Sequence, residues 1–263
     1  MTHKRFSLRI MALLLGALLL LPSAFANLED IQERGYAIVV MSGEYPPFSM
    51  PDEAGNMIGM DADVATEIAA RLGVEARLQQ AEFSTIVGGI QSGAYDFSVA
   101  SHAATEERMR AVAFSDTPYY YSGGQMFIHE DLDYANLDEM AADNAAIAVD
   151  LGGTNQHYLE DIGYPNVDTY SGIQDSLLAV GSGRAAGVFT SPIVGFIAMD
   201  EGQPIKPIDG LIFEENAFVL LAHGNDDLEA AINQALQDMR EDGTLLEISM
   251  RWIGGDIVTP PAE

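Results

Sequence analysis

The sequence predicts an α/β protein built from two lobes with a cleft between them. Apolar runs typical of buried strands alternate with helical patterns whose apolar residues recur every three or four positions. This alternation indicates βαβ units and parallel sheets. Two such series follow each other, and a return segment ends the chain. At 263 residues, the length suits one large domain or two of about 130 residues.

The first series contains two predicted strands and three predicted helices. Its strands are continuous apolar runs, as expected of buried parallel strands, and its helices carry cap residues or terminal glycines. In order, the elements are a strand over 36–41, a helix over 61–72 followed by Gly73, a short helix capped by Ser84 and ended by Gly93, a strand over 95–101, and a short helix begun by Thr105.

The second series and the tail follow the same alternation. Helical spacing is clearest near the end, where Leu228, Ile232, Leu236 and Met239 share one face. The elements are a strand over 145–149, the turn Gly152-Gly153-Thr154 and a helix through Tyr158, a helix from Ile173 to about Gly181, strands over 187–190 and 218–222, a helix capped by Asn225, and a last helix through Trp252.

Composition limits the possible functions. The chain is 48% apolar and contains no cysteine, which is typical of a globular protein and excludes disulfides, thiolate metal sites and thiol nucleophiles. With 40 acidic and 12 basic residues, the formal net charge is −28. A surface of this sign repels phosphate backbones and anionic lipid headgroups, so nucleic acids and membrane surfaces are disfavoured as partners.

A secretory signal peptide is predicted over residues 1–26. Its parts are a basic start, a short apolar run and an A-x-A cleavage site: Lys4, Arg5 and Arg9; residues 10–21; and residues 24–26. The apolar run is too short for a comfortable membrane span, although an uncleaved anchor is the alternative. Cleavage after Ala26 would leave a soluble exported protein that starts at Asn27 and resides in the periplasm.

Removing this segment makes the chain more acidic. Three of the basic residues and none of the acidic ones lie in it, so the mature chain would carry nine bases against 40 acids, a net charge of −31. Lys206 would be its single lysine. Because high salt screens self-repulsion, we interpret this composition as adaptation of an exported protein to a saline medium and not as information about its ligand.

A proline-rich loop directly follows the first predicted strand. The segment Ser42-Gly43-Glu44-Tyr45-Pro46-Pro47-Phe48 has two prolines that restrict it to an extended course. It lies at the C-terminal end of a strand, where open α/β sheets bind ligands. The alternative interpretation is a rigid turn with buried aromatic side chains.

Several further motifs occur in a defined order after this loop. They are Gly59-Met60-Asp61-Ala62-Asp63-Val64-Ala65, Gln91-Ser92-Gly93-Ala94-Tyr95-Asp96, Thr105-Glu106-Glu107-Arg108, Phe114-Ser115-Asp116, Gly152-Gly153-Thr154 and Asp242-Gly243-Thr244. In this order the chain resembles the family 3 extracellular solute-binding proteins, which are periplasmic receptors of polar amino acid ABC importers. The resemblance covers nearly the whole predicted mature chain.

The resemblance implies a type II periplasmic binding protein fold, in which two α/β lobes joined by two crossover strands close on a small ligand. It implies lobe 1 over 27–122 and 218–263 and lobe 2 over 123–217, with crossovers near 120–127 and 214–218. It also implies a membrane permease as partner, and we expect a monomer without a cofactor.

The resemblance further assigns ligand contacts. Arg108 stands where the family keeps the arginine that binds the ligand's carboxylate, and the planar guanidinium suits that group. Tyr45 and Phe83 match positions that form an apolar wall around the ligand. Gly153 and Thr154 match a turn whose backbone N–H groups and hydroxyl reach the ligand, and a helix N-terminus favours anions.

Two positions depart from the family pattern. The usual threonine or serine before the capping threonine is Ala103, and the aspartate that normally pairs with the ligand's α-ammonium is replaced by Ser191. Since a buried ammonium needs a charged partner, an ordinary L-amino acid is a poorer candidate than the resemblance alone suggests.

Other residues near the cleft offer replacements. Glu44 lies in the ligand loop and Asp150 ends a strand beside the glycine turn. An acidic surface residue is an equal alternative for Glu44 and the favoured one for Asp150. Ser101 and His102 end the strand at the cleft, Ser101 as an expected ligand contact and His102 as either a ligand contact or a packed, hydrogen-bonded histidine. None of the five histidines forms a metal-binding pattern such as H-x-x-x-H.

Arg108 opposite Glu44, with aromatic rings between them, would suit a compact zwitterion with a delocalised cation. Ectoine-type osmolytes fit this description, and ectoine-binding relatives carry a glutamate in the first loop. A carboxylate without an amine is the other candidate. The rival class is an enzyme on the same scaffold, such as a cyclohexadienyl-type dehydratase, with Glu44 or Asp150 as general acid. A periplasmic sensor would share the fold.

We expect the stability of the protein to rise with salt, because counterions screen the repulsion among its acidic residues. The measurement is the melting temperature in sodium chloride from about 0.05 to 2 M, over which the Debye length falls several-fold. A melting temperature that stays flat or falls over this range would contradict the saline adaptation.

Overall fold

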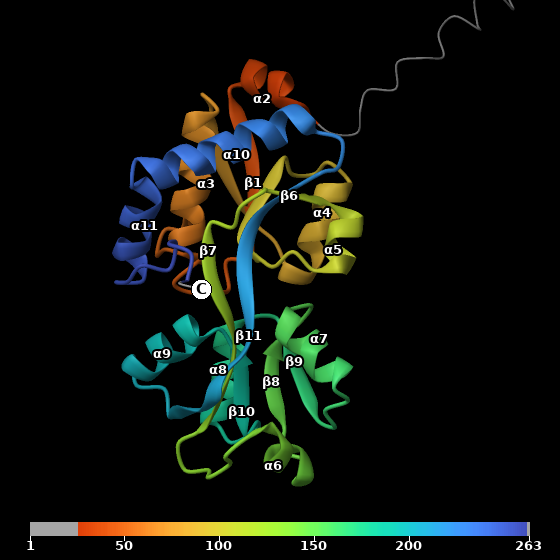
Figure 1. Ribbon diagram of the computed structural model, residues 1–263, viewed down its shortest axis with the longest axis vertical. Helices are drawn as coiled ribbons and strands as arrows, with labels where there is room; N and C mark the ends of the chain where they lie inside the picture. Colours follow the sequence, from red (N-terminus) through yellow and green to blue (C-terminus); the bar gives the residue numbers. More distant parts are fainter. Residues whose placement is uncertain (1–25, 262–263) are drawn as a thin grey trace, which may run out of the picture.

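The computed structural model describes residues 26–261, and all of the predicted signal peptide except Ala26 lies outside the described residues. Two α/β lobes lie one above the other, joined by two long strands (Figure 1). This confirms the predicted fold class. Among the described residues, no helix has the length and apolar character needed to cross a membrane.

Lobe 1 is a sheet covered by helices. Strand β1 pairs in parallel with β4 on one side and β5 on the other, and a short hairpin, β2–β3, precedes the longest early helix. The strands are β1 (Tyr36–Met41), β2 (Met50–Pro51), β3 (Met57–Ile58), β4 (Glu75–Gln80), β5 (Phe97–His102) and β6 (Ala113–Phe114). The helices are α2 (Leu28–Arg34), α3 (Met60–Arg71), η1 (Phe83–Thr85), α4 (Ile86–Gln91), α5 (Glu106–Ala111), α10 (Asp226–Glu241) and α11 (Thr244–Trp252).

Lobe 2 repeats the plan on a smaller scale. Its parallel strands are β8 (Ile147–Asp150), β9 (Val167–Tyr170) and β10 (Gly187–Thr190), in the order β10-β8-β9. Its helices are α6 (Leu137–Ala142), α7 (Thr154–Asp161), α8 (Ile173–Gly181) and α9 (Pro192–Asp200). Ile147 and Val149 belong to one buried cluster and Ala148 to another, so β8 is buried on both faces, as its continuous apolar run indicates.

Two long strands connect the lobes. They are β7 (Tyr120–His129) and β11 (Ile205–Leu221), which pair antiparallel over most of their length and run side by side through both lobes in Figure 1. Their register places Glu214 opposite Gly123 and Ala217 opposite Tyr120, with an irregularity between Ile208 and Phe213. The expected crossover segments lie within these strands, and β11 begins nine residues before the expected segment. The lobe boundaries stay a prediction.

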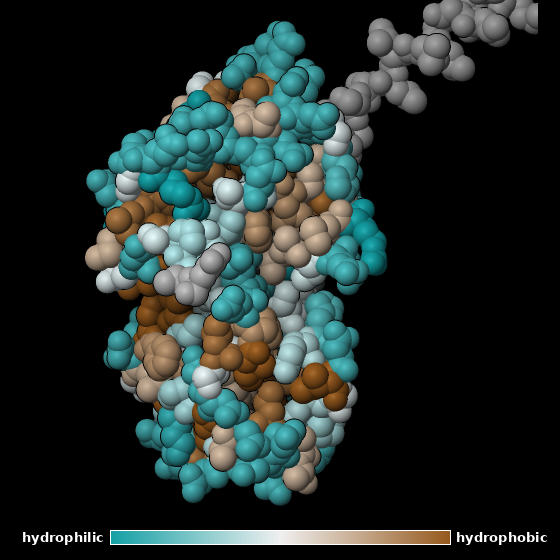
Figure 2. Space-filling view, in the orientation of Figure 1, coloured by the Kyte–Doolittle hydropathy of each residue, from teal (hydrophilic) through white to brown (hydrophobic). Residues whose placement is uncertain are grey.

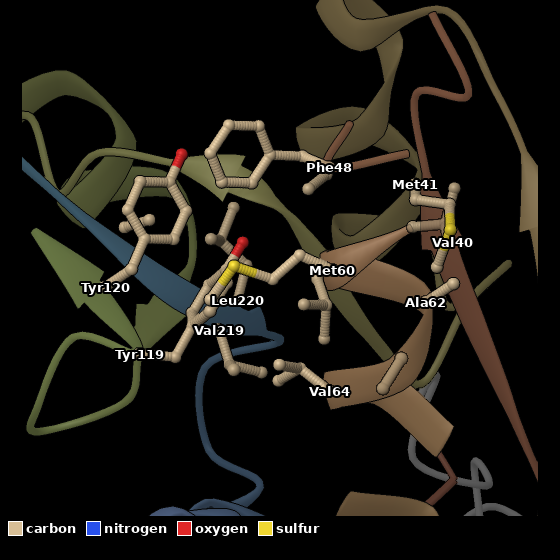
Figure 3. Close-up of a cluster of buried hydrophobic side chains, with 14 of the residues drawn as sticks. Val40, Met41, Phe48, Met60, Ala62, Val64, Tyr119, Tyr120, Val219 and Leu220 are labelled. Carbon is tan, nitrogen blue, oxygen red and sulfur yellow. The ribbon is translucent and has the colours of Figure 1, made fainter. Parts of the chain in front are cut away.

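The core of lobe 1 packs against the start of this strand pair. Figure 3 shows Phe48 and Tyr120 with their rings close together, and their centroids are 4.7 Å apart. Met60 and Val64 of α3 approach Tyr119, Val219 and Leu220, and all of these side chains are buried. Burying each large apolar side chain contributes about 1.5–3 kcal/mol, so the crossover strands are anchored in the core of lobe 1.

Local sequence signals explain most helix ends, with two corrections. Thr105 caps α5 by accepting the backbone N–H of Arg108 at 3.2 Å. Ser84 does not cap a helix, because it lies inside the short η1 turn. Asn225 directly precedes α10, but its side chain makes no cap and instead donates to the carbonyl of Ala26 at 2.8 Å.

The visible surface is largely polar. In Figure 2, hydrophilic side chains cover the upper end of the molecule around α2 and α10, while apolar ones gather nearer the junction of the lobes. The acids outnumber the bases so strongly that few can be paired: five ion pairs between arginine and carboxylate occur in the described part of the chain. The unpaired acids are those that salt would screen.

Candidate functional site

A cavity that is partly open to solvent lies between the two lobes, where parallel strands of both lobes end. The space among its lining residues is about 750 Å³, which includes open solvent at its mouth. The lining comes from lobe 1, lobe 2 and the crossover strands: Ser42, Glu44, Tyr45, Phe83, Ala100, Ser101, Arg108, Tyr120, Ser122, Gly123, Asp150, Gly153, Thr154, Asn155, Ser171, Gly172, Ser191, Glu215 and Ala217.

The two lobes touch directly across this cavity. The N–H of Ile173 donates to the carbonyl of Glu44 at 3.3 Å, and Nη2 of Arg108 donates to the carbonyl of Gly152 at 2.8 Å. A Cβ atom at Gly172 would lie 2.6 Å from Cβ of Glu44, so a side chain there would push the lobes apart. The structure is therefore a closed arrangement.

Among the described residues, Arg108 is the one basic residue that lines the cavity. Its Nη1 donates to the carbonyl of Ala103 at 3.2 Å, and its guanidinium carbon lies 5.3 Å from the centroid of the Phe83 ring. Burial lowers the pKa of Arg108, partly opposed by Glu215 and Glu107, but an arginine keeps its charge. The guanidinium has five N–H donors, so donors remain for a ligand.

The N-terminus of α7 lies at the same end of the cavity. Gly153 is its N-cap residue, and Thr154 and Asn155 begin the helix. The first N–H groups of a helix have no partner within it and favour an anion. The Thr154 hydroxyl, which we expected to reach the ligand, instead donates to Oε1 of Glu215 at 2.7 Å.

Glu215 is a cavity residue that sequence reasoning missed. It lies in β11, where β11 crosses between the lobes, and burial raises its pKa, partly opposed by the Thr154 hydroxyl and Arg108. No motif marks it, because it is one acid among 40. The expected crossover at 214–218 was the one available signal, since a residue there faces the cleft.

Two further carboxyl groups, those of Asp150 and Glu44, line the cavity. Asp150 directly precedes the turn into α7, and its carbonyl accepts the Gly153 N–H at 3.1 Å. Burial raises the pKa of Asp150 to about 7, with the Ser176 hydroxyl opposing the shift and Glu44 adding to it. Burial also raises the pKa of Glu44, as do Glu82 and Asp175, while Ser171 opposes the shift. Asp150 and Glu44 therefore repel each other when both are ionised.

Tyr45 lines the cavity near both Asp150 and Glu215. Burial raises its pKa, the carboxylates of Asp150 and Glu215 add to this shift, and the hydroxyl of Ser191 opposes it. Its ring stacks on Phe48 at 5.5 Å between centroids. Phe83 and Tyr45 both line the cavity, and their contact with a ligand stays a prediction. The Ser191 side chain caps α9 by accepting the Val194 N–H at 3.2 Å.

Ser101 lines the cavity through its backbone. Its hydroxyl donates to the buried carboxyl of Asp61 at 3.1 Å, and the Tyr119 hydroxyl donates to the same carboxyl at 2.7 Å. The Ser101 N–H in turn donates to the Tyr119 oxygen at 2.8 Å. This network holds Ser101 at a φ of 54°, in a left-handed conformation that a residue other than glycine rarely adopts. The hydroxyl thus stabilises the backbone at this position, and the ligand contact expected of Ser101 stays a prediction.

His102 and Ala103 lie outside the cavity lining. The His102 ring stacks behind Phe83 at 4.4 Å between centroids. Neither of its nitrogens has a hydrogen-bond partner among the described residues, so it is packed but not hydrogen-bonded. Burial lowers its pKa, with Arg108 adding to the shift. The Ala103 carbonyl accepts a hydrogen bond from Arg108 and so helps to orient the guanidinium.

The cavity is rich in acceptors. Glu44, Asp150 and Glu215 face the single base Arg108, and Oδ1 of Asn155 and Oγ of Ser122 are buried without a partner in the described part of the chain. Within residues 26–261, no cluster of His, Asp and Glu is arranged to hold a metal ion. Such a cavity can hold a small organic molecule that offers one anionic group and more than one hydrogen-bond donor or positive charge.

The fold and the cavity together define a two-lobed α/β protein that encloses a small solute. Residues 37–255 match the bacterial extracellular solute-binding proteins, family 3, and the chain belongs to this family.

Named relatives bind amino acids or their derivatives. The L-cystine-binding protein TcyJ of Escherichia coli (strain K12) is 27% identical over 88% of this chain and 87% of its own length. The arginine-binding periplasmic protein of Mannheimia haemolytica is 29% identical over 83% and 91%, respectively. By their names these relatives are binding proteins and not enzymes.

Similar solved structures include binding proteins. A mutant of ArgBP from T. maritima superposes with a TM-score of 0.81 and 26% identity, covering 87% of this chain and 99% of that one. An ancestral amino acid-binding protein described as a precursor of cyclohexadienyl dehydratase has a TM-score of 0.80 and 26% identity, covering 86% and 99%.

Asp150→Asn should make the ligand-free protein more stable relative to wild type as pH rises from about 4 to 7. An unfolded aspartate loses its proton near pH 4, whereas Asp150 keeps its proton up to about pH 7 when folded. The folded state then binds more protons, so this group lowers stability with rising pH. Chemical denaturation at pH 4, 5.5 and 7 measures the change, which amounts to at most about 4 kcal/mol.

Asp161→Asn is the control, because Asp161 is exposed on α7. A difference in unfolding free energy between Asp150→Asn and wild type that is the same at all three pH values would show that Asp150 is not a buried, isolated acid.

Proposed function

We propose that this protein is an exported substrate-binding protein of an ABC importer that captures a compact zwitterion with a carboxylate and a delocalised cation, such as an ectoine-type osmolyte. The main observation in support of this proposal is the cavity between the lobes, whose described lining contains one arginine and three carboxyl groups. In this function residues 1–26 serve as the signal peptide, the periplasm is the location, a membrane permease is the partner, and the protein acts as a monomer.

The carboxylate of the ligand is assigned to the end formed by Arg108 and α7. Arginine binds carboxylates through two parallel N–H donors, and the helix N-terminus adds backbone donors at Thr154 and Asn155. The Thr154 hydroxyl already donates to Glu215, so the ligand's carboxylate would bind Arg108 and backbone N–H groups.

The cation of the ligand is assigned to the carboxyl groups of Glu44 and Asp150. Both residues line the cavity together with Tyr45, and an aromatic face attracts a delocalised cation. Three acids against one base make an organic acid without a cation a poor fit, because its charge would add to theirs. A zwitterion leaves an excess of acceptors, which the donors of a delocalised cation can fill.

An enzyme is the second candidate. Its support is Asp150, whose pKa of about 7 suits a general acid near neutral pH, together with the similarity to the precursor of cyclohexadienyl dehydratase. Incubation with prephenate or arogenate, followed by product analysis, decides this point. Catalytic formation of product would replace the binding function, whereas unchanged substrate would leave it in place.

The ligand class is tested by the melting temperature of the protein in 1 M sodium chloride with a panel of compounds. The panel contains ectoine, glycine betaine, L-arginine, L-cystine, succinate and the remaining standard amino acids. A ligand that binds only the folded state raises the melting temperature. We expect ectoine to give the largest increase and the standard L-amino acids little or none. Micromolar binding of a standard amino acid would refute the osmolyte assignment and favour an amino acid carrier.

Arg108→Ala should weaken binding of the panel's best ligand by about 30-fold or more, because removing a buried charged hydrogen-bond donor costs about 2–5 kcal/mol. The variant also loses the contact with Gly152 that joins the lobes. Calorimetric titration measures the affinity. Arg184→Ala is the matched control, since Arg184 is exposed in lobe 2. Affinity of the Arg108 variant within tenfold of wild type would place the anchor elsewhere.

A further inference from the structure

Asp150 is a half-buried acid of the cavity. It ends β8 and lines the cavity, and its one side-chain hydrogen bond comes from the Ser176 hydroxyl at 3.3 Å. Within the described part of the chain, no basic side chain comes within 4 Å of it. Leaving a buried carboxylate uncompensated costs several kcal/mol, so the site is incomplete in charge.

The position of Asp150 is defined by the register of lobe 2. Strands β8 and β10 are parallel neighbours, with Val188 opposite Ala148. Continuing this register by two residues places Asp150 level with Thr190, directly before Ser191. Neighbouring strands lie about 4.8 Å apart, so Asp150 and Ser191 project from the same edge of the sheet into the same cavity.

Ser191 carries no charge, and its side chain is committed to the α9 N-cap through the Val194 N–H. An aspartate is as good an N-cap as a serine. At this edge of lobe 2, position 150 carries a carboxylate. Position 191 could carry one as well, because an aspartate there would keep the helix cap.

We propose that Asp150 is the residue that pairs with the cationic group of the ligand and thereby determines that the cavity accepts a cation. The proposal rests on the function proposed above, because it concerns the same cavity.

The two other acids of the cavity are less suited to this role. Glu215 is engaged by the Thr154 hydroxyl and lies toward Arg108, whose charge it offsets. Glu44 is more open, and Glu82 and Asp175 surround it with further negative charge. Asp150 is less exposed to water than Glu44, so a cation gains more from pairing with Asp150.

The test compares wild type, Asp150→Asn and the double variant Asp150→Asn/Ser191→Asp. Each is titrated calorimetrically at pH 8 with ectoine, L-arginine and succinate, and Asp161→Asn is the control. We expect Asp150→Asn to weaken binding of ectoine, the cation-bearing probe expected to bind wild type, at least tenfold, while any binding of succinate is unchanged or tighter. In the double variant, the carboxylate is moved from position 150 to position 191 after the neighbouring strand. We expect this variant to bind a cation-bearing probe at least tenfold more tightly than Asp150→Asn does, with L-arginine favoured.

The outcomes separate the two proposals. If wild type binds one of the cation-bearing probes and Asp150→Asn binds it within threefold, the role of Asp150 is wrong while the binding function stands. Weakening of all three probes alike, succinate included, would also overturn the role, because it would indicate a general structural defect. If wild type binds neither cation-bearing probe, the proposed function fails, and the role of Asp150 fails with it.

Discussion

The antiparallel pairing of β7 and β11 is the constraint on which the cavity depends. These strands run through both lobes, and they bring Tyr120, Glu215 and Ala217 to the level where strands of both lobes end. The pairing needs a close approach, because a Cβ atom at Gly123 would lie 2.2 Å from the Phe213 carbonyl. The apolar packing of Tyr119 and Tyr120 in lobe 1 then fixes where the cavity begins.

Charge imbalance is the chemical consequence of this arrangement. Arg108 and Glu215 offset each other, while Asp150 and Glu44 form no ion pair among the described residues. Removing a lone carboxylate from water is unfavourable. Burial therefore raises the pKa of Asp150 to about 7, so that the neutral acid persists to a higher pH. A ligand with its own cation can take the place of that proton at Asp150 while its carboxylate binds Arg108.

The fold was predictable because its signals are local and ordered. Continuous apolar runs marked the buried strands β1 and β10, and the Thr105 cap positioned Arg108 beside the cavity. The role of Ser101 was not predictable, because its direction depends on Asp61 and Tyr119, which are 40 and 18 residues away in the chain. Glu215 was missed for a related reason: its partner Thr154 is 61 residues distant, and nothing local distinguishes it from the acids of the surface.

The most direct test of the charge imbalance is the number of protons exchanged when the protein binds its ligand at pH 7. Calorimetric titration with the best zwitterionic ligand, repeated in buffers of different ionisation enthalpy, gives this number. A cation that ionises Asp150 should release about half a proton at this pH, and Asp150→Asn should abolish the release. Proton uptake, or no exchange in wild type, would contradict a cation paired with Asp150.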